Sequence, residues 1–305
     1  MRHSLHLIGA TLAATLIAGA PLPGRASPPP AAIPASIYTD PAPDKAHPAR
    51  MEVLHIKSGG VEINGVAYLP SGAGLHPTVI ICHGLPGNEK NLDLAQALRR
   101  QGWNAVTFNY RGSWGSPGAF RFGQNPEDAR AVLAYLRDPA NAAKLGVDPA
   151  RIAMVGHSMG GWVTAMAGAA EQGLGGPGLK GLVLVSAADI GLMGKASLED
   201  RVNLVKENHE TLADAPVETL AEELATHAAE WDYVNKADAL KTTPLLVLTS
   251  DDGLQPHGAM LVEAVRKAGG RKVETVHVAT DHGWSDHRIE LEARVIRFLE
   301  PLLGQ

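Results

Sequence analysis

Short apolar runs separated by helix-patterned segments limit the fold of this chain more than any other feature. The runs suit strands buried on both faces and lie at 78–82, 104–110, 151–155, 182–185, 245–248 and 273–278. The segments with helical spacing lie at 91–101, 127–137, 159–170, 258–268 and 288–303. Strands that alternate with helices pair in parallel through right-handed crossovers, which places helices on both faces of the sheet. The sequence therefore predicts an α/β fold with a mostly parallel central sheet, preceded by a hairpin of 51–57 and 61–69.

The first 50 residues do not follow this pattern. Residues 1–26 contain no acidic residue, and their apolar run of about 16 residues is shorter than the roughly 20 that a membrane span needs. We interpret 1–26 as a secretory signal peptide cleaved after Ala26, with an uncleaved amino-terminal anchor as the alternative. Residues 27–50 hold seven prolines, so we predict an extended linker there and one folded domain over 51–305. The mature protein is expected to be periplasmic or secreted, with no membrane span.

One segment interrupts the alternation of strands and helices. Residues 190–242 separate two predicted strands and carry helical patterns at 196–210 and 216–229. A compact domain does not leave a connection of that length without structure. We therefore predict a small helical cap over the carboxyl edge of the sheet, where parallel α/β sheets bind their ligands.

Composition excludes several classes of function. The formal net charge of −5 makes the chain a poor partner for a phosphate backbone, so we predict no nucleic-acid binding. Cys82 is the single cysteine, which rules out an intramolecular disulfide and zinc sites built on paired cysteines. The chain has no GxxxxGK[ST] phosphate loop and no HExxH motif. We predict neither a cofactor nor a metal, and the oligomeric state stays unknown.

The segment Gly156-His157-Ser158-Met159-Gly160 follows one buried strand directly and opens the next helix. A strand that turns sharply into a helix crowds its own backbone, and the two glycines relieve that crowding. Such a turn presents Ser158 at the carboxyl end of the strand and at a helix amino terminus, which favours negative charge. The motif predicts that Ser158 is a nucleophile, the alternative being a glycine-rich turn with a capping serine.

A serine hydroxyl needs a base, and that base needs a carboxylate to hold its tautomer. Three histidines lie near the last predicted strand, and we favour His282 in the following loop over His277 and His287. Among the acids we favour Asp252, in the turn after the strand at 245–248. Asp251, next to it, and Asp189, after the strand at 182–185, are the alternatives.

The elbow motif and the chain order Ser158, Asp252, His282 resemble the α/β-hydrolase superfamily over about residues 51–303. In that family the residue after a His-Gly pair donates one oxyanion-hole N–H and the residue after the nucleophile donates the other. The resemblance assigns these roles to Leu85, in His83-Gly84-Leu85-Pro86-Gly87, and to Met159. The His-Gly-Gly-Gly motif of some lipases and esterases is absent. The loop at 110–118 is similar to prolyl-oligopeptidase-like catalytic domains, here without the propeller that usually precedes them.

These features predict an exported serine hydrolase that cleaves small carboxylic esters through an acyl-enzyme. A peptide or amide hydrolase with the same triad is one alternative, and a non-catalytic binding protein on this scaffold is another. Aromatic residues near the expected active-site edge are candidates for an apolar substrate pocket. They are Trp114, Phe120, Trp231 and Tyr233. The alternative for the last two is that they fasten the cap helices to the sheet.

Overall fold

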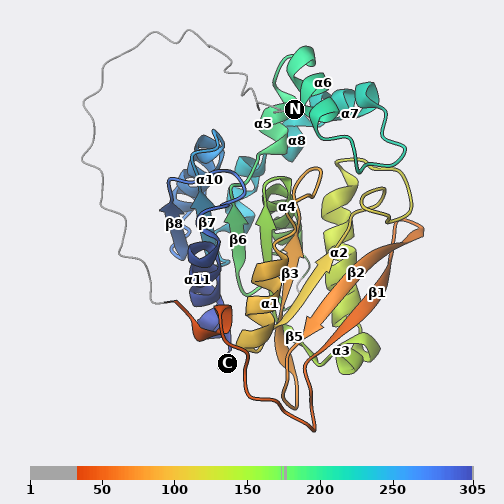
Figure 1. Ribbon diagram of the computed structural model, residues 1–305. Helices are drawn as coiled ribbons and strands as arrows, with labels where there is room; N and C mark the ends of the chain where they lie inside the picture. The colour runs from red at the N-terminus through yellow and green to blue at the C-terminus, as the bar shows by residue number, and fades with distance from the viewer. Residues whose placement is uncertain (1–32, 173, 175–176, 304–305) are drawn as a thin grey trace, which may run out of the picture.

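One eight-stranded sheet forms the centre of the molecule, with the strand order β1-β2-β4-β3-β5-β6-β7-β8 (Figure 1). The computed structural model describes residues 33–303 apart from 173, 175 and 176, so the predicted signal peptide at 1–26 lies outside the described residues. The strands are β1 (Arg50–Ser58), β2 (Val61–Leu69), β3 (His76–Cys82), β4 (Asn104–Phe108), β5 (Val147–His157), β6 (Leu182–Val185), β7 (Leu245–Thr249) and β8 (Val273–His277). The pairs β1–β2 and β2–β4 are antiparallel and all other neighbours are parallel, which confirms the mostly parallel sheet.

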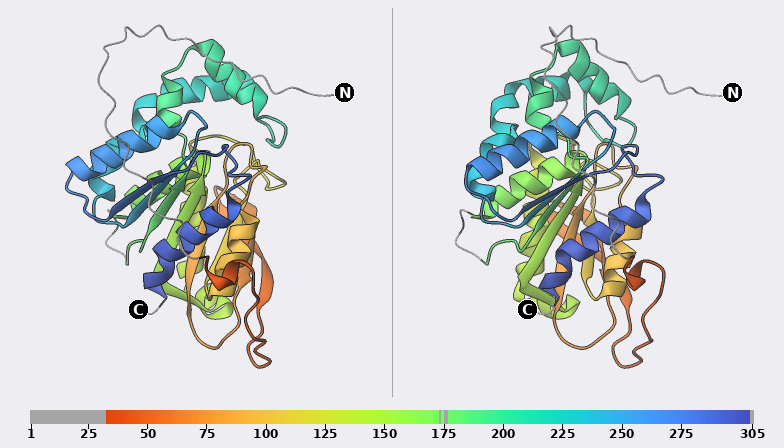
Figure 2. Two further views of the ribbon diagram at one scale, coloured as in Figure 1. Left: turned by 60° about the vertical axis from the view of Figure 1, so that its left-hand side comes forward. Right: turned by 90° about the vertical axis from the view of Figure 1, so that its left-hand side faces the viewer.

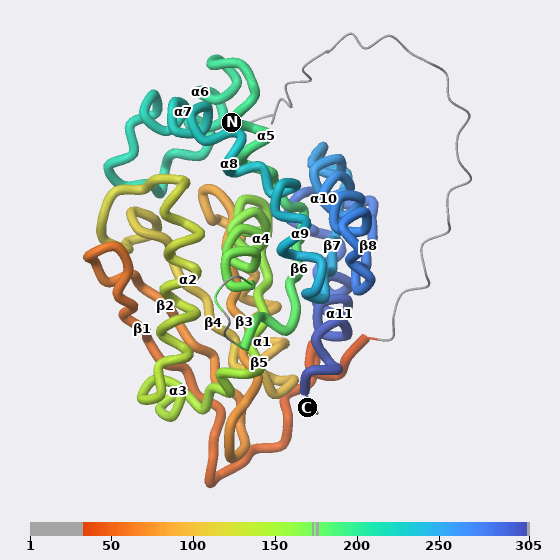
Figure 3. Tube along the Cα trace, turned by 180° about the vertical axis from the view of Figure 1, so that it is seen from behind, coloured from red at the N-terminus to blue at the C-terminus, as the bar shows by residue number. Residues whose placement is uncertain are grey.

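Helices cover both faces of the sheet. The helices α1 (Leu92–Gln101) and α11 (Arg288–Leu299), followed by η3 (Glu300–Leu302), lie on one face (Figure 1). The opposite face carries α2 (Gln124–Arg137), α3 (Pro139–Leu145), α4 (Met159–Gln172) and α10 (Gln255–Lys267), as Figure 3 shows. Alternate residues of β3 pack into the two cores, Val79 and Ile81 with α1 and α11, Ile80 and Cys82 with α2 and α4. Two-sided burial explains why this strand is a continuous apolar run.

The segment after β6 forms the predicted helical cap. It contains α5 (Ile190–Gly194), α6 (Leu198–Glu207), α7 (Val217–Thr226) and α8 (Ala228–Trp231), which lie beyond the carboxyl ends of the strands (Figures 1 and 2). The two predicted helices correspond to α6 and α7. The chain then returns through η2 (Tyr233–Lys236) and α9 (Ala237–Leu240), which pack against α4. Ser197 and Asp189 cap α6 and α5 by accepting backbone N–H groups.

The first described residues of the predicted linker pack on the domain. The short helix η1 (Ala35–Ile37) packs against α1 and α11, and Ser36 is buried, whereas residues 38–49 are mostly exposed and form no helix or strand. The Arg100 side chain at the end of α1 donates hydrogen bonds to the carbonyls of Ser36 and Ile37. Prolines remove N–H donors but leave every carbonyl available as an acceptor, so a proline-rich segment can still be held by a neighbouring arginine. Within the described part of the chain, no helix has the length and apolar character needed to cross a bilayer.

Candidate active site

Ser158 lies on a sharp turn between β5 and α4. Its φ of +58° falls in the left-handed region that non-glycine residues rarely adopt. The two motif glycines are required by contact distances. A Cβ on Gly156 would lie 1.9 Å from the Gly160 carbonyl oxygen, and a Cβ on Gly160 would lie 2.1 Å from the Cys82 carbonyl oxygen. The strained turn is held by the Ser158 N–H, which donates to the Val185 carbonyl at 2.9 Å.

His282 and Asp252 form a close pair at the same edge of the sheet. Nδ1 of His282 donates to Oδ2 of Asp252 at 2.7 Å, and the Leu254 N–H donates to Oδ1 at 2.9 Å. The Asp252 side chain is 3% exposed. Burial raises its pKa, but the hydrogen bonds from His282 and Leu254 outweigh burial, so the pKa of Asp252 lies below its usual value. With Nδ1 bound to a carboxylate, the Nε2 atom of His282 keeps its lone pair for a proton.

The three predicted catalytic side chains open onto one cavity of about 420 Å³. Its apolar walls come from both the sheet edge and the cap, and are Leu85, Met159, Ala188, Ile190, Met193, Leu204 and Leu254. Besides Ser158, Asp252 and His282, the polar residues that line it are Glu207 and Asn208, at the end of α6. The cap is therefore part of the pocket wall, as the position of 190–242 in the sequence predicted.

The alternative acids and histidines lie in other arrangements. Asp251 does not line the cavity and accepts from Nε2 of His277 at 3.0 Å, in a solvent-exposed pair. Asp189 is the buried amino-terminal cap of α5 and accepts the Leu192 N–H. His287 pairs with Asp286 at 2.9 Å at the start of α11. None of these residues lines the cavity that contains Ser158.

Leu85 and Met159, the predicted oxyanion donors, both line the cavity beside Ser158. Met159 is the first residue of α4, and the first N–H groups of a helix have no acceptor within it. The Leu85 N–H has no hydrogen-bond acceptor among the residues that the structure describes. Gly84 brings this loop close, since a Cβ there would lie 2.8 Å from the Ser158 Cβ. Among the residues that the structure describes, neither of these two N–H groups has an acceptor.

His157, the residue before Ser158, does not line the cavity and contacts the loop of His282. Its Nε2 donates to the backbone carbonyl of His282 at 2.8 Å, and the two rings lie 4.7 Å apart. Burial, followed by the nearby His282, lowers the pKa of His157 to about 4, so the ring is neutral at pH 7. His157 therefore holds the loop that carries His282. Apart from the position of His157 next to Ser158, nothing in the sequence indicates this role.

The predicted aromatic pocket is wrong for Phe120, Trp231 and Tyr233, which are buried. Trp114, at 37% exposed, lies outside the cavity. None of the four rings lines the cavity. Phe120 and Tyr233 are fully buried, and Trp231 is nearly so, with its ring 5.6 Å from that of Trp162. The Trp162 indole N–H also donates to the Trp231 carbonyl at 2.7 Å, which fastens the end of the cap to α4. Large rings that pack between the cap and the sheet are buried there and do not reach the cavity.

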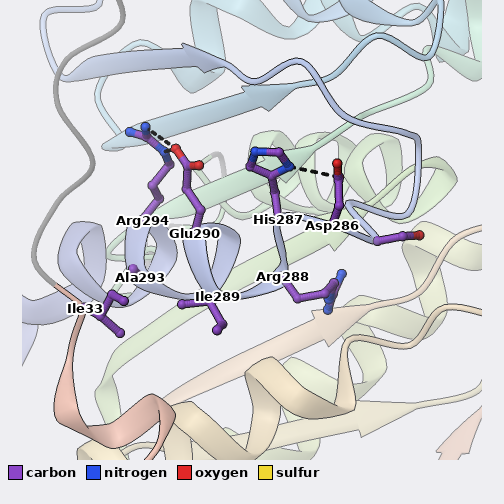
Figure 4. Close-up of a pocket in the computed structure, with 9 residues that line it drawn as sticks. Ile33, Asp286, His287, Arg288, Ile289, Glu290, Ala293 and Arg294 are labelled. Carbon is purple, nitrogen blue, oxygen red and sulfur yellow. Dashed lines mark hydrogen bonds and ion pairs between the residues drawn. The ribbon is translucent and has the colours of Figure 1, made fainter.

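A second hollow of about 370 Å³ lies along the first half of α11 and reaches Ile33 (Figure 4). Figure 4 shows two pairs among its polar side chains, Arg294 with Glu290 and His287 with Asp286. Arg288, which also lines the hollow, pairs instead with Asp93 at 2.6 Å. None of the predicted site residues lines it. Within the described ranges, no group of three or more His, Cys, Asp or Glu side chains is arranged to hold a metal ion.

Comparison with known proteins decides the family. A model of the family described as alpha/beta hydrolase fold matches residues 94–285, more than half of the chain. The chain belongs to this family. Among solved structures, this alpha/beta hydrolase resembles a hyperthermophilic esterase from the archaeon Pyrobaculum calidifontis at TM-score 0.64 and 22% identity, covering 84% of this chain and 87% of that one. It also resembles EstE1, a thermostable carboxylesterase from a metagenomic library, at 0.61 and 22%, covering 84% and 90%.

A third structural relative is the Pyrococcus horikoshii acylaminoacyl peptidase, at TM-score 0.61 and 18% identity, covering 83% of this chain and 41% of that one. At these identities the likeness concerns the fold. An uncharacterized protein of Mycobacterium tuberculosis, found in strains H37Rv and CDC 1551, is 32% identical over 121 residues. That match covers 39% of this alpha/beta hydrolase and 41% of the curated relative, so it spans about two fifths of each chain.

Proposed function

We propose that this protein is a serine hydrolase that cleaves carboxylic esters with Ser158, His282 and Asp252. The observation that carries the proposal is a single cavity into which the elbow serine and the His282–Asp252 pair both open. Membership of the alpha/beta hydrolase fold family and the fold shared with esterases support it. The strained backbone at Ser158 supports it too, because strain of this kind is retained where function requires it.

In the first half of the proposed reaction, Nε2 of His282 accepts the Ser158 hydroxyl proton while Oγ attacks the acyl carbon. The carbonyl π-bond opens, and the negative charge on its oxygen is stabilised by the N–H groups of Leu85 and Met159. Asp252 stabilises the imidazolium ion that forms on His282. When the tetrahedral intermediate collapses, the ester C–O bond breaks and His282 gives its proton to the departing alcohol oxygen.

Water completes the cycle on the acyl-enzyme. His282 accepts a proton from the water as its oxygen attacks the acyl carbon, and the same two N–H groups hold the second oxyanion. Collapse releases the carboxylic acid and returns the proton to the Ser158 oxygen. The His282 imidazole carries every proton transfer in both halves, so no cofactor enters this mechanism.

The pocket favours a modest apolar group on the substrate. Apart from the catalytic residues, most side chains that line the pocket are aliphatic or thioether groups. The cap contributes Ile190, Met193 and Leu204. A volume of about 420 Å³ suits a small molecule, as in other ligand pockets of this size. We therefore propose esters of short to medium acyl chains as substrates.

Peptide or amide bonds are the second candidate substrate class, because an acyl-enzyme route serves both. The fold shared with an acylaminoacyl peptidase favours this candidate, as does the loop at 110–118. A panel of p-nitrophenyl esters of rising chain length, compared with peptide and anilide substrates, decides between the two.

The test of the nucleophile is Ser158→Ala. We expect kcat to fall by about 10⁴-fold or more, since triad residues act as a unit, while the melting temperature stays near that of the parent. A fluorophosphonate probe should label the parent and not the variant. Labelling of the variant, or activity within a few-fold of the parent, would contradict the assignment, and an unlabelled parent would favour a non-catalytic binding protein.

We also propose that the protein is exported, with 1–26 removed and the mature chain periplasmic or secreted. The apolar run that precedes Ala26 supports this. Amino-terminal sequencing of protein recovered outside the cytoplasm should begin at Ser27. A chain that keeps Met1 and stays with the membrane fraction would instead favour the uncleaved anchor.

A further inference from the structure

The backbone carbonyl of Pro86 accepts hydrogen bonds from two side chains that belong to distant segments. The indole N–H of Trp114 donates to it at 2.7 Å, and the hydroxyl of Thr211 donates at 3.0 Å. Trp114 belongs to the loop after β4, and Thr211 belongs to the part of the cap between α6 and α7. Pro86 itself directly follows Leu85, the candidate oxyanion donor. Three separate parts of the chain therefore meet at one oxygen atom beside the site.

The two donors are also joined to each other. The backbone N–H of Trp114 donates to the Thr211 carbonyl at 3.2 Å, and an antiparallel bridge pairs Ser113 with Leu212. Trp114 has a φ of +49°, an uncommon conformation that these contacts hold in place. Nζ of Lys90 lies over the indole ring, 4.1 Å from its centre. The indole N–H is thus fixed in direction.

This part of the cap is fastened to the body of the domain. The Ala213 N–H donates to the Gly112 carbonyl at 2.7 Å, and the Phe120 N–H donates to the Ala213 carbonyl at 2.9 Å. Such a ladder of backbone hydrogen bonds holds residues 211–213 against the loop after β4. We do not expect this region to open as a lid, because opening would break these bonds together with both contacts to Pro86.

Holding the Pro86 carbonyl restricts the Leu85 N–H. Only the backbone torsions of Leu85 and Pro86 separate the two groups, and the proline ring removes one of those torsions. The loop is tight as well: a Cβ on Gly87 would lie 2.4 Å from the His83 ring and 2.8 Å from the Trp114 indole nitrogen. A fixed Pro86 carbonyl therefore narrows the range of positions that the Leu85 N–H can take.

We propose that Trp114 and Thr211 are positioning residues of the oxyanion hole, which hold the Leu85 N–H through the Pro86 carbonyl. The inference rests on the proposed ester hydrolysis. Loss of one oxyanion donor typically lowers kcat by about 10²–10³-fold. Removal of one of two supports should misplace the donor rather than abolish it, so we expect a decrease of roughly 10-fold for each variant. Substrate binding in the aliphatic pocket should change little.

The test compares Thr211→Val, which keeps the shape and removes the hydroxyl, with Thr211→Ser, which keeps the hydroxyl. Trp114→Phe is a second, independent variant that keeps an aromatic ring and removes the N–H. The assays are kcat and KM with p-nitrophenyl butyrate, and the inhibition constant of a trifluoromethyl ketone, whose adduct with serine places an oxyanion in the hole. For Thr211→Val and Trp114→Phe we expect kcat to fall and the inhibition constant to rise by about the same factor, with KM within two-fold. Thr211→Ser should retain parental values.

Glu223→Gln is the matched control. The Glu223 carboxylate accepts the N–H groups of Phe122 and Gly123 at 3.1 and 3.0 Å, so it joins the cap to the same loop without touching Pro86. We expect this variant to lower the melting temperature while kcat stays within two-fold. The proposal is overturned if Thr211→Val and Trp114→Phe both leave kcat and the inhibition constant within two-fold, or if the control lowers kcat as they do. A parent that hydrolyses no ester would overturn the proposed function as well, whereas an active parent with unaffected variants would overturn this inference alone.

Discussion

Asp252→Asn tests the proposed acid with little change of shape. The parent side chain is 3% exposed and accepts from Nδ1 of His282 at 2.7 Å and from the Leu254 N–H at 2.9 Å. An asparagine that keeps its oxygen toward Leu254 turns its NH₂ group toward His282. Nδ1 must then act as an acceptor, which puts the ring proton on Nε2, where the Ser158 proton should be received.

The size of the effect has two sources. A carboxylate and an imidazolium about 4 Å apart attract each other by about 4 kcal/mol at an effective dielectric constant of about 20. The His282 side chain is 41% exposed, so solvent screening reduces this to roughly 2–3 kcal/mol. At about 1.4 kcal/mol per decade, the lost charge alone lowers kcat by about 10²-fold. The unfavourable tautomer adds to this, and we expect a total decrease of about 10³–10⁴-fold.

The neighbouring Asp251 supplies a matched control. It forms a similar hydrogen bond with His277, at 3.0 Å, but its side chain is 62% exposed and lies outside the cavity. We expect Asp251→Asn to keep kcat within two-fold, measured with p-nitrophenyl butyrate under the same conditions. The reasoning is refuted if Asp252→Asn retains more than a tenth of parental kcat, or if the two variants are equally impaired.

Two further predictions concern stability. Gly160→Ala would place a Cβ 2.1 Å from the Cys82 carbonyl oxygen, so we expect a loss on the order of 3 kcal/mol or more in the free energy of unfolding; a melting temperature within about 2 °C of the parent would contradict this. Burial and the nearby Asp232 raise the pKa of Asp189 to about 6. The folded carboxyl therefore binds a proton more tightly than the unfolded one, and its ionisation weakens folding as pH rises from about 4 to above 6. In urea unfolding at pH 8, Asp189→Asn should raise the free energy of unfolding by up to about 3 kcal/mol, from two pKa units at about 1.4 kcal/mol each. At pH 4 the same substitution should change the free energy of unfolding little. An equal effect at both pH values would exclude ionisation of Asp189 as the cause.

The centre of the sheet was predictable because β3, β4, β6 and β7 are buried on both faces. The run 182–185 matches β6 in full, and its neighbour β7 is equally apolar and buried. Two-sided burial leaves no room for polar residues, so the sequence itself records the strand. The meeting of Ser158, Asp252 and His282 at one edge follows from the same topology, since each residue comes shortly after a parallel strand.

The contacts between cap and sheet could not be predicted in the same way. Trp231 and Phe120 were expected to face the ligand, but both close the junction beneath the cap. Whether a ring faces a pocket or a neighbouring helix depends on how α8 and α4 pack, and no local spacing records that. Thr211 was missed for a similar reason: a single threonine in a cap loop has no feature that points to the Pro86 carbonyl 125 residues earlier in the chain.

The end of the molecule where η1 meets α11 has a practical consequence for handling the protein. The short helix η1 lies against α1 and α11, and the end of α11 with η3 lies nearby, at the opposite end of the molecule from the cap (Figures 1 and 2). The cavity around Ser158 opens at the cap end. A protein attached to a bead or a sensor chip through its carboxyl-terminal side would therefore present its pocket to the solution, and immobilisation in that orientation should leave turnover of small esters unhindered.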